Sequence, residues 1–343
     1  MIVAVGLLGA CSAPPPTDLS TPAPAVSVPM PQVQPPATPK PSPTKAKPTT
    51  SPLSGRKGGV DTPVVVVKLD NTPSAQPHRN LVKADMVYVE PVEWGLTRLA
   101  AVYSTSIPKV AGPVRSARIS DIDLFAPFGD IAFVFSGAQK RLLPKLAKAD
   151  WTEVSPDVGS PGFHRENGTG RVAPYNLMAE PQRIVATSGA TATAPDLGLT
   201  FSKKRPAEGS KVSRMTARWP ASSAQFRWNA DTQAFDVWFG GRQGRDTSRP
   251  YEQRASTVIV QYVKQTDSGY GDKFGGVTPL TVTTGKGRGV LLRDGRSWPI
   301  RWSKPSDEAN TAYTDSSGKP IALAPGQVWI VLKDRSSKVE LDR

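Results

Sequence analysis

Short apolar runs separated by polar turns fill the chain after about residue 60, and their spacing changes along the sequence. Val64 to Val67 is an apolar, β-branched run that predicts a buried strand. Similar runs predict strands at 86–90, 99–103 and 131–135, whereas the apolar spacing at 118–125 and 138–149 is helical. Strands that alternate with helices predict an α/β sandwich in this part of the chain.

A second pattern follows a connector of small residues at 190–195. It consists of short β-rich segments with turn residues between them, and no long helical repeat interrupts it. The segments span 212–219, 224–228, 235–239, 257–263, 280–284, 289–292, 298–302 and 328–332. We therefore predict an α/β (α+β) domain over 61–188, followed by a mostly antiparallel, β-rich domain over 196–335.

The segment before these domains has a different composition. From Ser12 to Leu53 it consists almost entirely of Pro, Ala, Thr, Ser and Val. Such a segment buries too little apolar area to offset the entropy lost when its backbone is ordered. We therefore predict a disordered, proline-rich tether over residues 11–60. Its extended length is on the order of 100 Å, at roughly 3 Å per residue.

Residues 1–10 are apolar and end in Leu8-Gly9-Ala10-Cys11, which resembles a bacterial lipobox. In that pattern a signal peptidase cuts before the cysteine, and the thiol accepts a diacylglycerol. The usual positively charged start is missing, so we interpret residues 1–10 as a truncated signal peptide and expect the natural start codon upstream. The run is too short to span a bilayer. The sequence predicts an extracytoplasmic protein that a lipid on Cys11 anchors to the cell membrane.

The chain is strongly basic, with 43 Lys and Arg against 29 Asp and Glu and a net charge of +14. This balance favours an anionic partner, which for an exported protein means lipid headgroups, peptidoglycan or an anionic wall polymer. The sequence holds no motif that reads nucleic acid, and we expect no nucleic-acid partner. With one cysteine and two histidines, we expect neither a metal site nor a cofactor.

Gly112-Pro113-Val114-Arg115-Ser116-Ala117-Arg118 is the most distinctive motif of the first unit. Other distinctive segments are Asp70-Asn71, Leu81 to Glu90, Glu93 to Arg98, Ser136-Gly137-Ala138, His164-Arg165, Arg171 and Ala173 to Leu177. Together they resemble the YerB-like lipoproteins, a family called DUF3048 with N-terminal and C-terminal halves. The resemblance is strong over 60–185 and continues through the β-rich unit. It implies a membrane-anchored envelope protein and brings no defined reaction.

Arg115 and Arg118 lie three residues apart after a Gly-Pro turn, at the expected start of a helix. In the first helical turns they would share one face, close to backbone N–H groups that favour anions. We predict that they form a carboxylate or phosphate site, because guanidinium groups bind such anions in a bidentate manner. The remaining candidate ligands are Arg98, His164, Arg165, Arg171 and Asn176. The alternative is a buried scaffold in which Arg115 or Arg118 pairs with Asp85, Glu90 or Glu93.

Carboxylates next to these arginines allow a second function. Glu90 and Glu93 stand at the end of a predicted strand, and Asp121 follows on the predicted helix. Two carboxylates can act as acid and base in glycosidic cleavage, and His164 is a candidate base. The alternative function is thus a hydrolase or transferase on peptidoglycan or a related glycan. No complete catalytic constellation is visible, so the preferred prediction is a non-catalytic module that binds an anionic wall component or an envelope enzyme.

Two further features of the β-rich unit bear on binding. Gly285-Lys286-Gly287-Arg288-Gly289 is rich in glycine and basic residues, as phosphate loops are. It lacks the strand, the Gly-Lys-Ser/Thr ending and the helix of such a loop, so we predict a hairpin turn instead. Several tryptophans in this unit could include a platform for sugar stacking, although most are expected in the β core.

Overall fold

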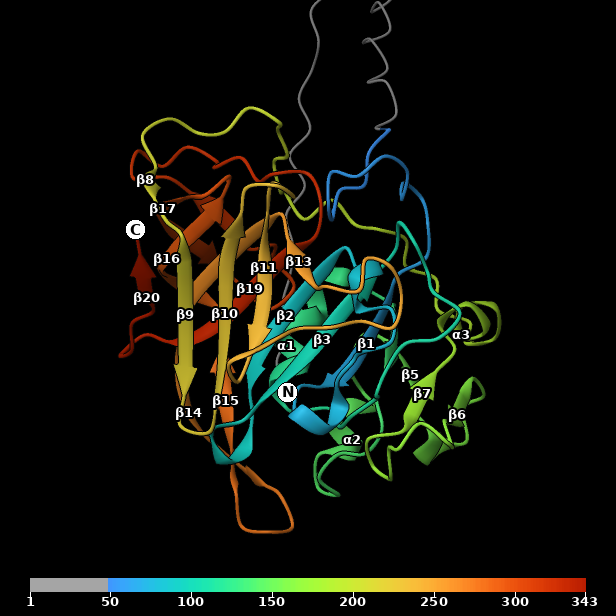
Figure 1. Cartoon of the computed structure of the whole chain (residues 1–343). Helices are drawn as coiled ribbons and strands as arrows, with labels where there is room; N and C mark the ends of the chain where they lie inside the picture. The colour runs from blue at the N-terminus through green and yellow to red at the C-terminus, as the bar shows by residue number, and fades with distance from the viewer. Residues whose placement is uncertain (1–48) are drawn as a thin grey trace, which may run out of the picture. The chain divides into compact units, whose positions relative to one another are not determined.

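The computed structural model describes residues 49–343 (Figure 1). The predicted signal peptide, the lipidation of Cys11 and most of the predicted tether lie outside the described residues. Within 49–343, every helix is too short or too polar to cross a membrane. All described residues belong to one compact unit.

A twelve-stranded mixed sheet forms the centre of this unit, in the order β18-β17-β16-β14-β19-β2-β3-β1-β4-β5, with β15 on β14 and β8 on β17. Its first-half strands are β1 (Val65–Asp70), β2 (Met86–Pro91), β3 (Thr97–Tyr103), β4 (Ala132–Val134) and β5 (Thr152–Val154). Its second-half strands are β8 (Ser210–Lys211), β14 (Thr257–Gly271), β15 (Val277–Val282), β16 (Gly285–Arg293), β17 (Arg296–Lys304), β18 (Ala312–Thr314) and β19 (Val328–Asp334).

A second, six-stranded sheet is antiparallel and packs on one face of the first (Figure 1). It contains β9 (Arg214–Trp219), β10 (Ser222–Asn229), β11 (Ala234–Phe239), β12 (Arg242–Gln243), β13 (Arg254–Ala255) and β20 (Glu340–Asp342). The strands β6 (Phe163–Arg165) and β7 (Leu177–Ala179) pair with each other. The helices are α1 (Ser120–Phe125), α2 (Leu143–Leu146) and α3 (Pro181–Thr187), with short 3-10 turns η1 (Pro73–Ala75), η2 (Leu81–Lys83), η3 (Glu93–Gly95), η4 (Ala126–Phe128) and η5 (Pro156–Val158).

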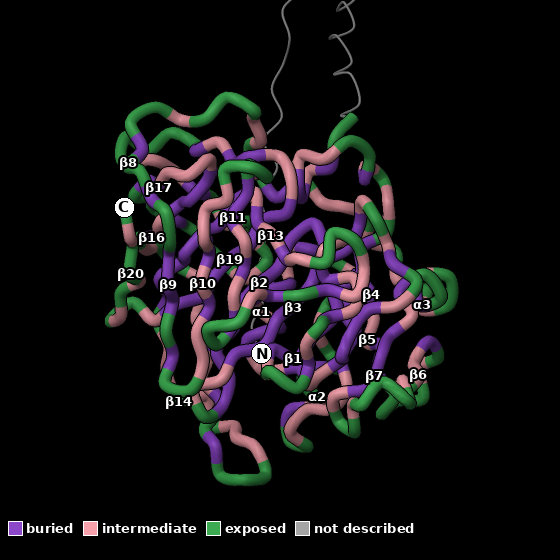
Figure 2. Tube along the Cα trace, viewed as in Figure 1, coloured by how far each residue is buried: buried purple, intermediate pink, exposed green. Residues whose placement is uncertain are grey.

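Two hydrophobic cores lie on the two faces of the large sheet, and buried positions run through its centre (Figure 2). Val65 and Val67 of β1 enter the core shared with the six-stranded sheet, whereas Val66 enters the core under α1. Successive side chains of a strand point to opposite faces, so a strand covered on both faces buries every position and is mostly apolar. This explains the continuous valine run and confirms the prediction of a buried strand.

The fold class agrees with the prediction, since a mixed α/β region precedes a largely antiparallel β region. The helix predicted at 138–149 is mostly wrong, because only Leu143–Leu146 is helical. The expected placement of Arg115 and Arg118 in a helix is also wrong, since α1 begins at Ser120. Arg115 is extended beside β1, where its N–H donates to the Lys68 carbonyl at 2.9 Å.

The predicted end of the tether at residue 60 is another correction. Leu53 and Ser54 are fully buried. The Ser54 hydroxyl donates to Asp85 at 2.6 Å, and Thr50 forms bridges with Lys57 and Gly58. Arg56 also donates to the carbonyl of Ala84 at 3.0 Å, so tertiary contacts order a segment whose composition alone indicates disorder. Residues 49–60 are therefore part of the folded body.

Both halves of the chain contribute strands to the large sheet. β2 of the first half pairs in parallel with β19 of the second half. The first half therefore completes its sheet with a strand that follows more than two hundred residues later in the sequence. The division into domains at 61–188 and 196–335 stays a prediction.

Candidate functional site

A cluster of charged side chains lies at the carboxyl ends of β1 and β2, on the face that α1 covers. Glu90 and Asp70 are both directly opposite Arg98, on the two neighbours of β3. Lys68 lies two residues before Asp70 and therefore on the same face. All four residues are at least 95% buried. The sheet thus gathers charges that are up to 30 residues apart in the sequence.

Lys68 holds two carboxylates at the centre of this cluster. Its Nζ lies 2.6 Å from Glu90 Oε1 and 2.7 Å from Asp121 Oδ1. Burial by itself lowers the pKa of Lys68, but the carboxylates of Asp121 and Glu90 outweigh it and raise that pKa. Burial and the nearby Asp121 carboxylate raise the pKa of Glu90 to about 8. A proton on Glu90 leaves one negative charge facing the single ammonium group.

Asp70 is the buried anion that draws two of the predicted arginines together. Arg115 Nε lies 3.2 Å from its Oδ2, and Arg98 Nη1 lies 3.9 Å from its Oδ1. Although burial raises the pKa of Asp70, these two arginines hold it below its usual value. Burial lowers the pKa of Arg98 to about 10. Arg98 Nε and Arg115 Nη1 are buried without a hydrogen-bond partner among the described residues.

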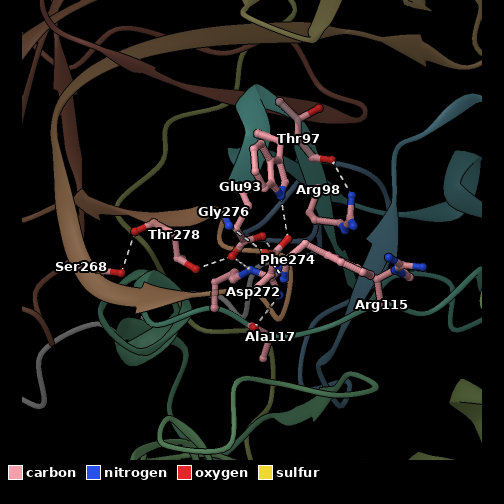
Figure 3. Close-up of polar contacts among 12 residues, drawn as sticks. Glu93, Thr97, Arg98, Arg115, Ala117, Ser268, Asp272, Phe274, Gly276 and Thr278 are labelled. Carbon is pink, nitrogen blue, oxygen red and sulfur yellow. Dashed lines mark hydrogen bonds and ion pairs between the residues drawn. The ribbon is translucent and has the colours of Figure 1, made fainter.

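The third predicted arginine, Arg118, forms a bidentate pair with Glu93. Its Nε lies 2.7 Å from Glu93 Oε1, and its Nη2 lies 2.5 Å from Oε2. Thr278 of β15 donates a second hydrogen bond to Glu93 Oε1, as Figure 3 shows. Burial raises the pKa of Glu93. The hydrogen bonds from Arg118 lower it by more than burial raises it, so the pKa lies below its usual value. Arg118 thus forms an ion pair that the scaffold alternative predicts. Arg115 also forms an ion pair, but with Asp70 and not with Asp85, Glu90 or Glu93.

A cleft of about 410 Å³ opens beside the Arg118–Glu93 pair. One wall consists of Ser116 to Arg118 and of the loop 137–140, which follows β4. The other wall consists of residues 270–273, at the end of β14 and in its connection to β15. The cleft therefore lies outside the carboxyl ends of β1, β2 and β4, the place where open α/β sheets usually bind ligands. We call it the arginine cleft.

Asp272 is the second carboxylate of the arginine cleft, and its oxygens are occupied by donors of the protein itself. Its Oδ2 accepts from the indole nitrogen of Trp94 at 2.8 Å. Its Oδ1 accepts from the backbone N–H groups of Phe274 at 2.9 Å and Gly276 at 2.8 Å (Figure 3). The bond from Trp94 holds the β14–β15 connection against η3, and the two backbone bonds lie within the connection. Asp272 therefore has a structural role, but its donors are neutral, and its negative charge is not paired as that of Glu93 is.

The other predicted ligands lie elsewhere. His164 is on β6, where its Nδ1 lies 3.0 Å from Glu180, and Arg165 donates to Asn176 at 2.8 Å on the same pair of strands. Arg171 donates to the carbonyl of Pro77. None of these side chains lines the arginine cleft. Tyr175 of this region lies against the cluster, with its ring centre 5.5 Å from the Arg115 guanidinium.

Sequence reasoning missed several residues of the site. Lys68 directly follows a run of four valines, and its alternation with Val66 places it inside the protein. A buried lysine requires carboxylate partners, so this position was a usable signal. Lys140 and Lys273, which line the cleft, stand in ordinary loop sequence, and Tyr270 stands at the end of β14, so none of the three gave such a signal.

The sequence matches both halves of one protein family. Residues 49–194 match the N-terminal domain of a protein of unknown function (DUF3048), and residues 215–330 match its C-terminal domain. "Putative lipoprotein YerB" of Bacillus subtilis (strain 168) is 38% identical over 105 residues, which are 28% of this chain and 31% of that protein. This sequence match therefore spans about a third of the relative.

A solved structure shows the same fold. The crystal structure of YerB protein from Bacillus subtilis superposes with a TM-score of 0.71 at 20% sequence identity, covering 86% of this chain and 99% of that one. The likeness extends over both halves, including the shared sheet. Because the two matched segments together span most of the sequence, this chain belongs to the DUF3048 family.

Proposed function

We propose that this protein is an extracytoplasmic lipoprotein, anchored to the cell membrane through an acylated Cys11, whose body binds an anionic component of the cell wall without catalysing a reaction. The lipobox-like Leu8-Gly9-Ala10-Cys11 supports the anchor. The name of the Bacillus subtilis relative, a lipoprotein, supports it as well. The arginine cleft supports the binding role.

The observation that carries the binding role is the state of the charges in the cleft. Its two carboxylates, Glu93 and Asp272, are occupied by donors of the protein itself. Lys140 and Lys273 are exposed at the same cleft and have no carboxylate partner among the described residues. Glu93 is neutralised by Arg118, whereas Asp272 accepts from neutral donors and keeps its negative charge. An anionic ligand would therefore meet two ammonium groups against one uncompensated carboxylate. Charge-assisted contacts of this kind are the strongest polar contacts that a ligand can make.

The arrangement favours binding over hydrolysis. Glu90 is 3% exposed and bound to Lys68, so its carboxyl group does not reach the cleft surface. Glu93 lines the cleft, but both of its oxygens accept hydrogen bonds from Arg118 or Thr278. His164 pairs with Glu180 on β6 and does not line the cleft. An acid and base pair for glycosidic cleavage needs two carboxyl groups that both face the substrate.

The test is a binding measurement with purified peptidoglycan as the probe. We expect the charge-reversing variant Lys140→Glu/Lys273→Glu to bind at least about tenfold more weakly at constant salt, since two charge-assisted contacts are lost. Both side chains are exposed, so the thermal midpoint should change little. Co-sedimentation at several protein concentrations gives the affinity.

The matched control is Lys204→Glu/Lys211→Glu, which changes the net charge equally at exposed positions outside the cleft. Its binding should equal that of the wild type. Equal losses in the two variants would show that only net charge matters, and unchanged binding in both would exclude the cleft as the site. Release of soluble fragments from the peptidoglycan would contradict the non-catalytic role.

A further inference from the structure

A second groove opens where β14 and β16 separate. β14 pairs with β16 as far as Gln261 opposite Gly289, and from Lys264 onward it pairs with β15 instead. β16 continues beyond this point paired with β17. The strands therefore fork, and the fork contains a groove of about 640 Å³. We call it the basic groove, and it shares no lining residue with the arginine cleft.

Four basic side chains line the basic groove: Lys264, Lys286, Arg288 and Arg335. No Asp or Glu among the described residues lines it. The carboxylates near its lining residues in sequence bind neutral donors of the protein. Asp267 accepts from the N–H of Gly269 at 2.7 Å, Asp307 accepts from Thr284, and Asp334 accepts from the N–H groups of Ser336 at 2.8 Å and Gln265 at 3.1 Å. Within the described part of the chain, none of the four cations forms an ion pair with a carboxylate. The groove thus concentrates uncompensated positive charge.

Arg288 makes two contacts with neighbouring residues in this groove. Its guanidinium lies 4.9 Å from the ring centre of Tyr262, and its Nη2 donates to the carbonyl of Arg335 at 3.2 Å. Across the strand pair, Arg288 lies directly opposite the exposed Arg301. Like charges at directly opposite positions destabilise a sheet. A bound anion would relieve this repulsion, which is a physical reason for an anion at this place.

The glycine-rich motif Gly285 to Gly289 has a different role from the turn that its sequence predicts. Gly285 to Gly289 is the first part of β16 and not a hairpin turn, so that prediction is wrong. A Cβ on Gly287 would lie 2.5 Å from Trp302 Nε1 and 2.9 Å from the carbonyl of Tyr262. Glycine is therefore required for the strand to pass this close to β14. It places the two neighbouring basic residues, Lys286 and Arg288, at the fork.

We propose that the basic groove binds a linear chain of phosphate groups, at a site separate from the arginine cleft. Several cations along a concave groove match several anions along a chain, whereas a flat membrane surface would reach only the protruding side chains. The aromatic rings offer no open face to a nucleic-acid base, because Arg288 covers Tyr262 and Trp302 is 4% exposed. The ligand is therefore recognised through its phosphates alone.

The experiment measures binding of the full chain to linear inorganic polyphosphate over a range of salt concentrations. Lys286→Glu/Arg335→Glu should bind at least tenfold more weakly and show a smaller salt dependence, because fewer counterions are released when fewer cations contact phosphates. Lys204→Glu/Lys211→Glu, with the same change in charge, should bind as the wild type does. The cleft variant Lys140→Glu/Lys273→Glu should also keep its polyphosphate binding, which separates this proposal from the proposed function.

Unchanged polyphosphate binding in the Lys286→Glu/Arg335→Glu variant, or an equal loss in the control, would overturn the proposal. A parallel measurement with vesicles of phosphatidylglycerol and phosphatidylcholine shows what the groove binds in that event. If the groove variant loses vesicle binding while its polyphosphate binding is intact, the groove faces a membrane and not a polymer. A thermal melt of each variant checks that all of them are folded.

Discussion

At the scale of single residues, the net charge of the buried cluster depends on which of its side chains are protonated. Lys68 faces two carboxylates at hydrogen-bond distance in a buried environment. If both were ionised, the three groups would carry a net negative charge out of water, which is costly. A raised pKa of Glu90 avoids this cost, because the protonated carboxyl group is neutral. The cluster is therefore sensitive to pH near neutrality.

The sign of this effect follows from proton binding in the two states. The pKa of Glu90 is about 8 in the folded protein against an ordinary 4.5. Between these values the folded state holds a proton that the unfolded chain has released. The stability that this proton contributes is fully present below pH 4.5 and is lost as the pH rises through 8.

We predict that the unfolding free energy of the wild type falls by about 1–2 kcal/mol between pH 6.5 and pH 8. The range starts at 6.5 because burial lowers the pKa of His78 below 6.5, and this shift acts in the opposite direction at lower pH. Glu90→Gln carries no titratable proton and should give a flatter profile. Urea unfolding at several pH values measures both proteins. Equal slopes would contradict the assignment to Glu90.

At the scale of elements, the connection between β14 and β15 shapes the arginine cleft, and few contacts fix its position. Asp272 receives the indole N–H of Trp94 together with two backbone N–H groups from its own connection. Trp94 adopts a left-handed backbone conformation with φ of 61°, which non-glycine residues rarely adopt. From this position in η3, the Trp94 indole reaches Asp272 in the β14–β15 connection.

We predict that Trp94→Phe loosens this connection while the fold persists. A smaller aromatic ring replaces the indole, and the hydrogen bond to Asp272 is lost, at a cost of about 0.5–1.5 kcal/mol. Hydrogen exchange of residues 272–276 should become severalfold faster. Trp238→Phe is the matched control, since the indole N–H of Trp238 has no hydrogen-bond partner among the described residues. Similar exchange rates in the two variants would show that this bond does not hold the connection.

At the scale of the whole molecule, the two sequence halves share both the sheet and its cores. β2 and β19 pair over four residues, and each core contains side chains from both halves. Gln327 strengthens the junction, because its amide donates to the carbonyls of Leu81 at 2.8 Å and Ala84 at 3.0 Å. Neither half can bury its edge strand without the other, and an exposed edge is a liability for a folded protein.

We therefore predict that residues 49–343 unfold in a single cooperative transition. Calorimetry should give equal calorimetric and van't Hoff enthalpies. Gln327→Ala, which leaves two buried carbonyls without this donor, should lower stability by about 1–3 kcal/mol without splitting the transition. The exposed Gln182→Ala is the control and should change stability by less than about 0.5 kcal/mol. Two resolved transitions would instead support independent domains.

The sequence by itself determined the positions of the strands and the faces they bury. Alternation and β-branched runs are local signals, because each residue's side is set by its neighbours along the strand. This is why the runs at 64–67, 86–90 and 328–332 all predict strands that the structure contains. The motif around Arg115 and Arg118, together with the other short segments of the first unit, indicated the family, because the residues of each segment are close in the sequence.

Only the tertiary structure decided which charges meet. Lys68 and Asp121 are 53 residues apart, and Glu93 and Thr278 are 185 apart, so their contacts depend on strand order and register. The same holds for the basic groove, whose four cations come from β14, from β16 and from the segment after β19. Local patterns contain no information about such pairings, since charge attraction acts on whichever groups the assembled sheet brings together.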